Sequence, residues 1–331
     1  MEGALGLLWL LAVGSVGGSS LGSPLGGQQQ QEGSPRAVSE QELSWVSEQL
    51  YEAERGKVGT EDILLRLQHR ISAQQASEGI DYASQSPRLC APHASPAPSL
   101  SLLSLFSRVN EEQLLSSATF RRLLALLDNY EALPGHNETV TAQEEEEEEA
   151  FLEAVFQTPV MATLSDFFLA KGLYPSEVAF RADLRQMWFG LYSRSGGRAL
   201  DSSGFEHVFC GELKKGQVSG CHSWVQLYLL ERSGELNYLS YSYDGPWTTF
   251  PDVLALQYRW RGHLKSIGTT LMGASPEFDL ALYTLCYKTR PDRLCHLSLG
   301  GKAVTIQTYS WANSFYGHRQ RFVATSYPVS P

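Results

Sequence analysis

The chain has 331 residues and a formal net charge of −10, with 43% hydrophobic and 19% charged residues. This composition is typical of a globular protein and excludes a chain that is disordered throughout. From residue 200 onward, 12 Lys and Arg stand against 10 Asp and Glu, so the acidity lies in the first part of the chain. The overall charge argues against tight, non-specific binding to long nucleic acids, but a cleft needs only local positive potential to hold a phosphate.

The N-terminus predicts a secretory signal peptide over residues 1–18. An apolar run over residues 4–13 is followed by mostly small residues up to residue 20, a pattern typical of a leader and too short for a membrane span. Residues 19–38 are rich in Gly, Ser and Gln, which predicts a disordered linker. We therefore expect a secreted protein with one folded region over residues 39–331.

Helices are predicted through the first part of the folded region. Ser39 can cap a helix in which Glu42 completes a capping box. Further helices are predicted over residues 62–68, 106–130 and 177–192. The acidic run 144–149 is interpreted as the solvated start of another helix, with metal or protein binding as the alternative. Asn137, in Asn-Glu-Thr, is a candidate glycosylation site.

The pattern changes to strands after Gly204. Apolar, β-branched and aromatic residues alternate or run together there, which favours strands. The predicted strands are the segments on either side of a turn at Gly216 and residues 224–230, 280–286, 304–311 and 321–326. Gly300-Gly301 is interpreted as a hairpin turn. Helices first and strands later predict an α+β fold, with a helical lobe over about 39–200 and an antiparallel-sheet lobe over about 201–331.

Two histidines are the best candidates for chemistry. His207 and His222 lie on either side of the predicted turn at Gly216, so a hairpin can bring both imidazoles towards one cleft. One imidazole can then act as a base while the other acts as an acid. A cation such as Lys265 can stabilise the negative charge that develops between them. An arbitrary pair of histidines is more often structural, so the surrounding motifs decide the interpretation.

Several short motifs occur in a fixed order along the chain. They are Phe205-Glu206-His207-Val208-Phe209, Gly211-Glu212, His222-x-Trp224, Ser275-Pro276-Glu277-Phe278 and Thr308-Tyr309-Ser310-Trp311. Together they resemble the EndoU family of RNA endonucleases, in particular its vertebrate poly(U)-specific group. The resemblance covers about residues 39–331 and implies an EndoU-like fold. It also implies cleavage of single-stranded, uridine-containing RNA through attack by the 2′-hydroxyl, leaving a 2′,3′-cyclic phosphate.

The resemblance implies catalytic roles for His207, His222 and Lys265. We favour His222 as the base and His207 as the acid, although the sequence does not decide between them. Ser223 stands where the family usually has Asn. Dependence on Mn²⁺ is implied as well, but no ligand set in the sequence indicates where the ion would bind.

Supporting residues are predicted around these three. Glu206 and Glu212 match acidic positions of the family motif, and each can orient an imidazole, raise its pKa or bind a divalent cation. A surface ion pair is the alternative for each. By the same resemblance, Thr269 contacts the uracil edge and Tyr309 packs on the sugar or base. Thr308, next to Tyr309, is predicted as a further substrate contact. A core aromatic is the alternative for Tyr309.

Cysteine usage leaves two possibilities open. The chain has five cysteines: Cys90, Cys210, Cys221, Cys286 and Cys295. The pairs Cys210–Cys221 and Cys286–Cys295 straddle predicted turns, so either could form a disulfide in an oxidising compartment; free buried thiols are the alternative. Ligand spacing for structural zinc is absent from the sequence.

One function of a different class competes with the enzyme. A secreted RNA- or glycan-binding protein could keep this fold and have lost the chemistry. The presence of His207, His222 and Lys265 together favours the enzyme, and we expect a monomer without a membrane span.

Overall fold

The computed structural model describes residues 37–54, 57–78 and 104–331. These residues fall within one unit, Pro35–Pro331. The signal peptide over 1–18, most of the linker over 19–38, and Cys90 lie outside the described residues, so the expectations for them stay predictions. Within the described residues, no helix is both long and apolar enough to cross a bilayer.

Helices predominate up to residue 189. They are α1 (Glu40–Glu54), α2 (Ala73–Ser77), α3 (Glu111–Ser116), α4 (Ala118–Leu126), α5 (Ala142–Phe156), α6 (Pro159–Ala170) and α7 (Glu177–Phe189). The capping box before α1 is confirmed: the Glu42 backbone N–H donates to Ser39 Oγ at 3.2 Å, and the Ser39 N–H donates to Glu42 Oε2 at 2.9 Å. Thr141 and Glu144 form a second capping box, so the acidic run begins α5 as predicted.

The helix predicted over residues 62–68 is wrong, and the one predicted over residues 106–130 is wrong in part. Strand β1 (Ile63–Leu65) pairs antiparallel with β2 (Phe106–Val109), where helices were expected. Short apolar runs do not distinguish a helix from a strand by periodicity. The pairing partner of each strand lies far away in the sequence, and this partner decides the conformation.

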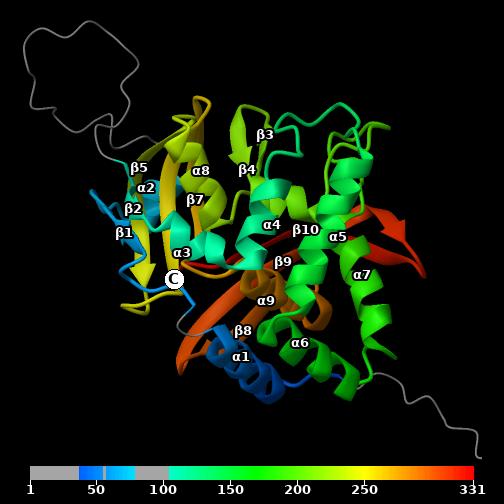
Figure 1. Cartoon of the computed structure of the whole chain (residues 1–331). Helices are drawn as coiled ribbons and strands as arrows, with labels where there is room; N and C mark the ends of the chain where they lie inside the picture. The colour runs from blue at the N-terminus through cyan, green and yellow to red at the C-terminus, as the bar shows by residue number, and fades with distance from the viewer. Residues whose placement is uncertain (1–36, 55–56, 79–103) are drawn as a thin grey trace, which may run out of the picture. The chain divides into compact units, whose positions relative to one another are not determined.

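Two sheets lie in the second part of the chain (Figure 1). The five-stranded sheet has the order β3-β4-β7-β6-β5, and the three-stranded sheet has the order β10-β9-β8. Their strands are β3 (Glu212–Lys214), β4 (Gln217–Ser219), β5 (Leu236–Gly245), β6 (Asp252–Trp260), β7 (His263–Met272), β8 (Leu294–Leu299), β9 (Lys302–Tyr316) and β10 (Gln320–Pro328). Apart from the parallel contact of β4 with β7, the pairs in these two sheets are antiparallel. The α+β prediction and the turn at Gly300-Gly301 are confirmed.

Two predicted strands are helices instead. Residues 224–230 lie in α8 (Trp224–Arg232), and residues 280–286 lie in α9 (Pro276–Thr289). Helix α9 is buried on every side from Pro276 to Tyr287, so its sequence lacks the polar stripe by which an amphipathic helix is recognised. The start signal was present: Ser275 Oγ accepts the Phe278 N–H at 3.3 Å, and proline occupies the first turn.

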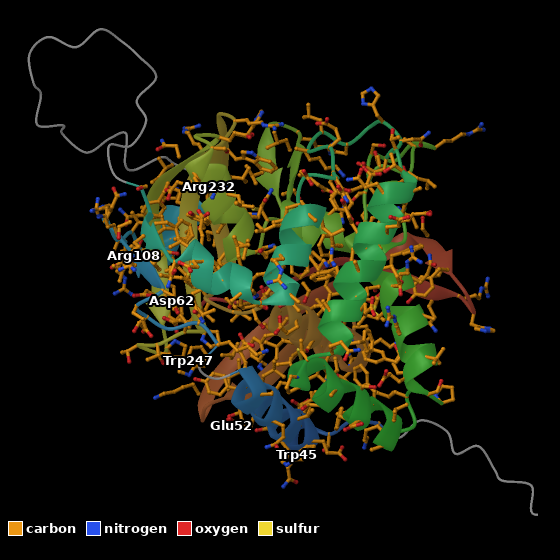
Figure 2. The ribbon with its side chains drawn as sticks, in the orientation of Figure 1. Trp45, Glu52, Asp62, Arg108, Arg232 and Trp247 are labelled. Carbon is orange, nitrogen blue, oxygen red and sulfur yellow. A yellow bond between two sulfur atoms is a disulfide. The ribbon has the colours of Figure 1, made fainter. Side chains whose placement is uncertain are left out.

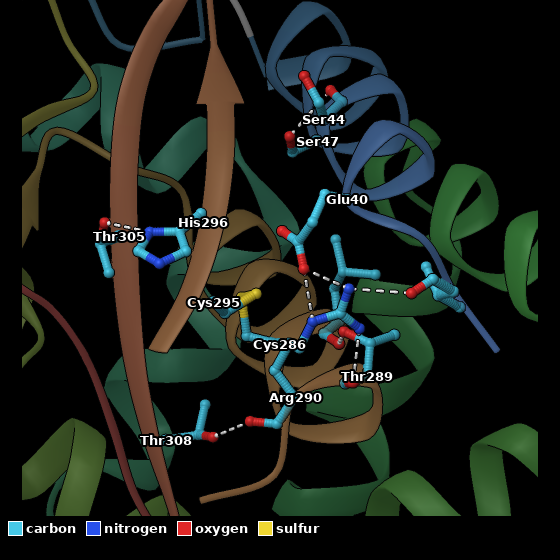
Figure 3. The surroundings of a disulfide bond; sticks show 12 residues. Glu40, Ser44, Ser47, Cys286, Thr289, Arg290, Cys295, His296, Thr305 and Thr308 are labelled. Atoms are coloured by element: carbon cyan, nitrogen blue, oxygen red, sulfur yellow. Dashed lines mark hydrogen bonds and ion pairs between the residues drawn. A yellow bond between two sulfur atoms is a disulfide. The ribbon is translucent and has the colours of Figure 1, made fainter. Parts of the chain in front are cut away.

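Helix α9 and the first helix both hold the three-stranded sheet. A disulfide joins Cys286 on α9 to Cys295 on β8, as one of the two candidate pairings predicted, whereas Cys210 and Cys221 are free buried thiols (Figure 3). Along β8, Ser47 of α1 donates to the Ser298 carbonyl at 2.8 Å. The outward side of α1 carries Trp45, which is 58% exposed (Figure 2). The division into two lobes near residue 200 stays a prediction.

Candidate active site

A π-helix carries the first histidine. Residues Glu206–Cys210 form this element, and the Gly211 N–H closes it by donating to the Glu206 carbonyl at 2.8 Å. The predicted strand is therefore wrong at this position. Phe205 and Phe209 stack with ring centroids 4.7 Å apart, a four-residue spacing that indicates a helix. Short π-helices are rare and occur often at functional sites.

The predicted hairpin follows directly and brings the second histidine back. Strands β3 and β4 pair around a turn at Lys215 and Gly216, both with positive φ. The returning chain bonds to the π-helix, because the Cys221 N–H donates to the His207 carbonyl at 2.9 Å and the His222 N–H donates to the Val208 carbonyl at 2.7 Å. The hairpin therefore places both histidines in one site, as the sequence predicted.

Gly220 makes this close approach possible. A Cβ at Gly220 would lie 1.9 Å from the His207 carbonyl oxygen, and the residue has a φ of +67°. The short distance excludes a side chain, and the positive φ also favours glycine. The glycine between the two histidines is thus a packing requirement of the site.

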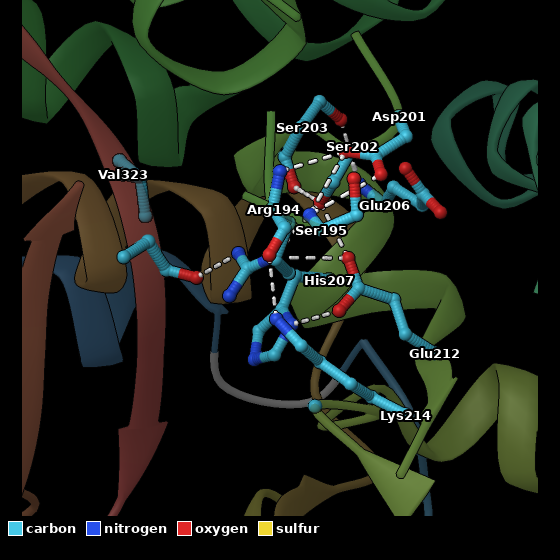
Figure 4. A network of polar contacts seen from close by, with 12 residues as sticks. Arg194, Ser195, Asp201, Ser202, Ser203, Glu206, His207, Glu212, Lys214 and Val323 are labelled. Carbon is cyan, nitrogen blue, oxygen red and sulfur yellow. Dashed lines mark hydrogen bonds and ion pairs between the residues drawn. The ribbon is translucent and has the colours of Figure 1, made fainter. Parts of the chain in front are cut away.

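Glu212 binds His207 through the Nδ1 atom of the imidazole. The Nδ1 atom of His207 lies 3.0 Å from Glu212 Oε2, and Glu212 Oε1 is bound by Ser202 and by Arg194 Nε, the latter at 3.1 Å (Figure 4). A carboxylate can only accept, so Nδ1 carries the hydrogen and Nε2 is left for the substrate. This orientation by a carboxylate agrees with one of the roles predicted for Glu212.

Arg194 anchors this carboxylate and was missed in the sequence. Its guanidinium is 8% exposed, bonds Ser202 Oγ at 3.0 Å and the Ala324 carbonyl at 2.7 Å, and lies 5.1 Å from the ring centroid of Trp311. Burial raises the pKa of Glu212, but the His207 imidazole, Arg194 and Ser202 together outweigh burial and hold this pKa below its usual value. Glu212 is therefore ionised at neutral pH.

Glu206 differs from Glu212 in charge. Its side chain is fully buried, and within the described residues neither carboxyl oxygen has a hydrogen-bond partner. Burial, followed by the negative charges of Glu212 and Glu138, raises the pKa of Glu206 to about 10. Glu206 is thus a neutral acid at pH 7 and does not bond either imidazole, in contrast to the orienting role predicted for it.

His222 is oriented by backbone and by an aromatic ring. Its Nδ1 lies 2.8 Å from the Thr269 carbonyl oxygen, which fixes the hydrogen on Nδ1 and leaves a lone pair on Nε2. The ring stacks on Tyr327 with centroids 4.9 Å apart, and Thr270 Oγ1 donates to the His222 carbonyl at 2.8 Å. Ser223 makes no side-chain cap bond to the following helix, so these contacts position His222 instead.

The third predicted residue lies beside the histidines on β7. Lys265 Nζ donates to the Gly220 carbonyl at 2.8 Å. Among the described residues, no carboxylate forms an ion pair with it. Burial lowers the pKa of Lys265 to about 8. The ammonium group is therefore mostly charged at pH 7 and available to an anion.

His207, His222 and Lys265 line one cleft of about 410 Å³. Gly220, Ile267, Thr269, Thr325, Tyr327, Pro328, Val329 and Ser330 complete its walls. Burial lowers the pKa of His207 to about 4 and that of His222 well below its usual value, and nearby Arg194 and Lys265 add to these shifts. Both imidazoles are therefore neutral at pH 7.

The three predicted substrate contacts differ in their position relative to the cleft. Thr269 lines the cleft. Tyr309 is 45% exposed at the cleft's edge, where its hydroxyl interacts with Tyr327. Thr308 is fully buried on the opposite side of β9 and donates to the Arg290 carbonyl at 3.0 Å, which corrects its prediction as a substrate contact.

Strand β10 supplies cleft residues that the sequence analysis did not find. Thr325 is directly opposite Tyr309 in the sheet register, and Tyr327 follows on the same face. The strand was predicted over residues 321–326, so Thr325 lay within it, whereas Tyr327 lay one residue beyond its predicted end.

A resident metal ion is not supported by the donor set. Within residues 37–54, 57–78 and 104–331, no group of three or more His, Cys, Asp or Glu side chains could hold one. The oxygens of Glu212 are occupied by His207, Arg194 and Ser202, and Glu206 is a buried neutral acid. Neither carboxyl offers the open, charged oxygens that Mn²⁺ prefers.

The two glutamates should respond differently to substitution by glutamine. Glu212→Gln is expected to lower kcat by about 10²–10⁴-fold, because an amide no longer fixes the His207 tautomer or supports its charged form. Glu206→Gln replaces a neutral acid with a neutral amide and should retain much of the activity at pH 7. Steady-state cleavage rates for both variants test this contrast, and equal losses would contradict it.

Glu206 should also affect stability at alkaline pH. Burial raises the pKa of Glu206 from 4.5 to about 10 in the folded state. The stability that protonated Glu206 gives to the folded state is therefore fully present below pH 4.5 and is lost as pH rises through 10. The urea midpoint of Glu206→Gln relative to the native chain should therefore increase between pH 6 and pH 9. A pH-independent difference would contradict the neutral state of Glu206.

Known proteins share both sequence and fold with this chain. The family model described as Endoribonuclease XendoU matches residues 42–328. The chain is 50% identical over 293 residues to uridylate-specific endoribonuclease C of Xenopus laevis, covering 88% of this chain and 90% of that protein. It is 43% identical over 294 residues to the uridylate-specific endoribonuclease of Homo sapiens, covering 89% and 67%. The solved structure of XendoU, "a splicing independent snoRNA processing endoribonuclease", is similar with a TM-score of 0.66 and 31% identity, covering 87% of this chain and 96% of that one.

Proposed function

The chain belongs to the XendoU family of endoribonucleases, and on that basis we propose that it cleaves single-stranded RNA at uridines. The observation that carries this proposal is the convergence of His207, His222 and Lys265 in one cleft. The 2′-hydroxyl of the uridine attacks the adjacent phosphorus, the bond from phosphorus to the 5′-oxygen breaks, and the ends are a 2′,3′-cyclic phosphate and a 5′-hydroxyl. No bond to the protein forms.

The hydrogen bonds support distinct roles for the two histidines. His222 is held by a neutral carbonyl, which supports the imidazolium less than a carboxylate does, and burial and Lys265 keep the ring neutral, so its Nε2 takes the proton of the 2′-hydroxyl. His207 is held by an ionised carboxylate, which favours the imidazolium, and its Nε2 gives a proton to the departing 5′-oxygen. Lys265 faces the negative charge that develops on the phosphate oxygens.

Substrate binding supplies the charge that the acid needs. The pKa of His207 is about 4, with burial as the main cause. A bound phosphodiester brings a negative charge close to both imidazoles, and an opposite charge raises the pKa of a base. Glu212 already supports the charged form of His207, so we expect the added charge of the phosphodiester to make His207 the imidazolium.

Cleavage of an oligonucleotide with a single uridine tests this proposal. The purified protein should cut at the uridine, and mass spectrometry should identify the cyclic phosphate end. Running the assay with Mn²⁺ and with EDTA tests the metal dependence that the family resemblance implies. Binding of the oligonucleotide without cleavage under either condition would favour the alternative, a binding protein that has lost the chemistry.

The side chain of Thr269 is proposed to read the uracil edge. Thr269→Val keeps the size of the residue and its carbonyl, which holds His222, but removes the hydroxyl. Losing one hydrogen bond to the base should lower the uridine-to-cytidine preference by about 5- to 20-fold. Competing cleavage of matched uridine and cytidine oligonucleotides measures this ratio. An unchanged preference would show that Thr269 only packs.

We also propose that the protein is secreted and glycosylated. The apolar leader over residues 1–18 supports this, as does the Cys286–Cys295 disulfide, which fits an oxidising compartment. Asn137 is exposed within its sequon. When expressed in secretory cells, the protein should appear in the medium without its leader and shift in mass on removal of N-glycans. A cytosolic protein that retains Met1 would contradict this.

A further inference from the structure

One face of the three-stranded sheet is open beside the cleft. Side chains of β8, β9 and β10 alternate between buried and partly exposed. The buried face packs against α9. The part of the other face nearest the cleft, here called the outer face, carries Leu294, His296, Thr305, Gln307, Tyr309, Thr325 and Tyr327. Figure 3 shows His296 and Thr305 on the side of the strands away from Cys295.

The strand register makes the outer face continuous with the cleft. Tyr327, a cleft residue, is directly opposite Gln307, and Gln307 is directly opposite Leu294. A second row begins at Val329 in the cleft wall, whose N–H donates to the Thr305 carbonyl at 2.8 Å. That row ends at His296, whose Nδ1 lies 3.1 Å from Thr305 Oγ1.

The chemistry of the outer face suits bases more than phosphates. None of its seven residues is a carboxylate or a permanent cation, although the chain has a net charge of −10. Tyr309 is 45% exposed and Leu294 is 46% exposed, so apolar surface is available on β9 and on β8. Neighbouring strands lie about 4.8 Å apart, so the face extends roughly 10 Å beyond β10. Open sheets with exposed rings commonly bind unpaired bases.

We propose that the outer face binds the bases of the nucleotides that flank the cleaved uridine. This inference rests on the proposed endoribonuclease function, because its ligand is the same RNA strand that occupies the cleft. Tyr309 offers a stacking surface next to Tyr327. Leu294 and His296 extend this surface to β8. The RNA strand passes over β8 after it leaves the cleft. The enzyme therefore prefers a uridine within a longer single strand to a uridine in a dinucleotide.

Substrate length tests this inference on the full chain. The substrates are a uridine-containing dinucleotide and two longer RNAs with the same scissile bond, one extended on the 5′ side and one on the 3′ side. The double variant Leu294→Ser/His296→Ala removes the outer part of the face. For this variant, kcat/KM for an extended RNA is divided by kcat/KM for the dinucleotide. For one of the two extended RNAs, this ratio should fall by about 5- to 10-fold relative to the native chain.

A matched control accounts for general effects of a polar substitution. Leu64 is 44% exposed on a strand of another sheet, close to the 46% of Leu294, so Leu64→Ser should leave the length ratio unchanged. A double variant with the native length ratio on both sides would overturn the inference while leaving the proposed function intact. Failure of the unsubstituted protein to cleave any of the three substrates would instead refute the proposed function.

Discussion

Replacing either His207 or His222 with alanine is expected to lower kcat by about 10²–10⁴-fold, the range that general acid–base groups contribute. In the proposed mechanism, His222→Ala removes the base that takes the 2′-hydroxyl proton, and His207→Ala removes the acid that protonates the 5′-oxygen. Their backbone bonds do not depend on the side chains, because the His207 carbonyl and the His222 N–H make the links between the π-helix and the hairpin. The fold should therefore persist, which circular dichroism and thermal unfolding can verify.

The two histidine variants should also differ from each other. A substrate whose 5′-oxygen is replaced by a better leaving group needs little help from an acid. Cleavage of this substrate should recover in His207→Ala and remain low in His222→Ala. Near-native turnover of ordinary RNA by either variant would remove that residue from the mechanism, and recovery in His222→Ala alone would reverse the assignment.

Replacing Lys265 with alanine is expected to lower kcat by about 10²–10³-fold with a smaller change in KM, because the ammonium group acts on charge that develops in the transition state. The pKa of about 8 for Lys265 has a further consequence. The charged form is present below this pH and is lost as pH rises through 8, so kcat/KM should decline on the alkaline side. Rate profiles between pH 6 and pH 10 measure this.

Lys265→Arg provides the matched control. Arginine keeps its charge at all accessible pH values, so the alkaline decline near pH 8 should disappear even where the different head-group geometry lowers the rate. A decline that persists unchanged in Lys265→Arg would assign it to another group. A rise in KM with unchanged kcat in Lys265→Ala would make Lys265 a contact for binding only.

Local signals in the sequence predicted the elements that depend on local contacts. The capping box at Ser39 and Glu42 and the turn at Gly300-Gly301 each need only a few neighbouring residues. Helix α9 was predicted as a strand because its burial on all sides, set by distant elements, removes the polar stripe. Strands β1 and β2 were missed because each forms only with a partner more than 40 residues away.

The candidate site also divides into residues that local sequence signals predicted and residues that tertiary packing brings in. His207 and His222 are joined by a short hairpin, so their convergence follows from the turn, and Lys265 enters through the family resemblance. Arg194 and Tyr327 reach the site through tertiary packing, which no motif indicated. Thr308 was chosen from a strand whose alternate residues face opposite sides of the sheet, and only the pairing of β9 with β10 shows which face meets the cleft.

The π-helix at Glu206–Cys210 makes the site depend on how many residues it contains, as well as on which ones. Its closing bond spans five residues, from the Gly211 N–H to the Glu206 carbonyl. Removing Val208 or Phe209 would turn this into the four-residue bond of an ordinary α-helix and rotate one side of the segment by about 100° relative to the other. A single codon deletion here would leave both histidines in the chain but would misalign their imidazoles. A laboratory library of one-residue deletions should therefore find this stretch intolerant of deletion.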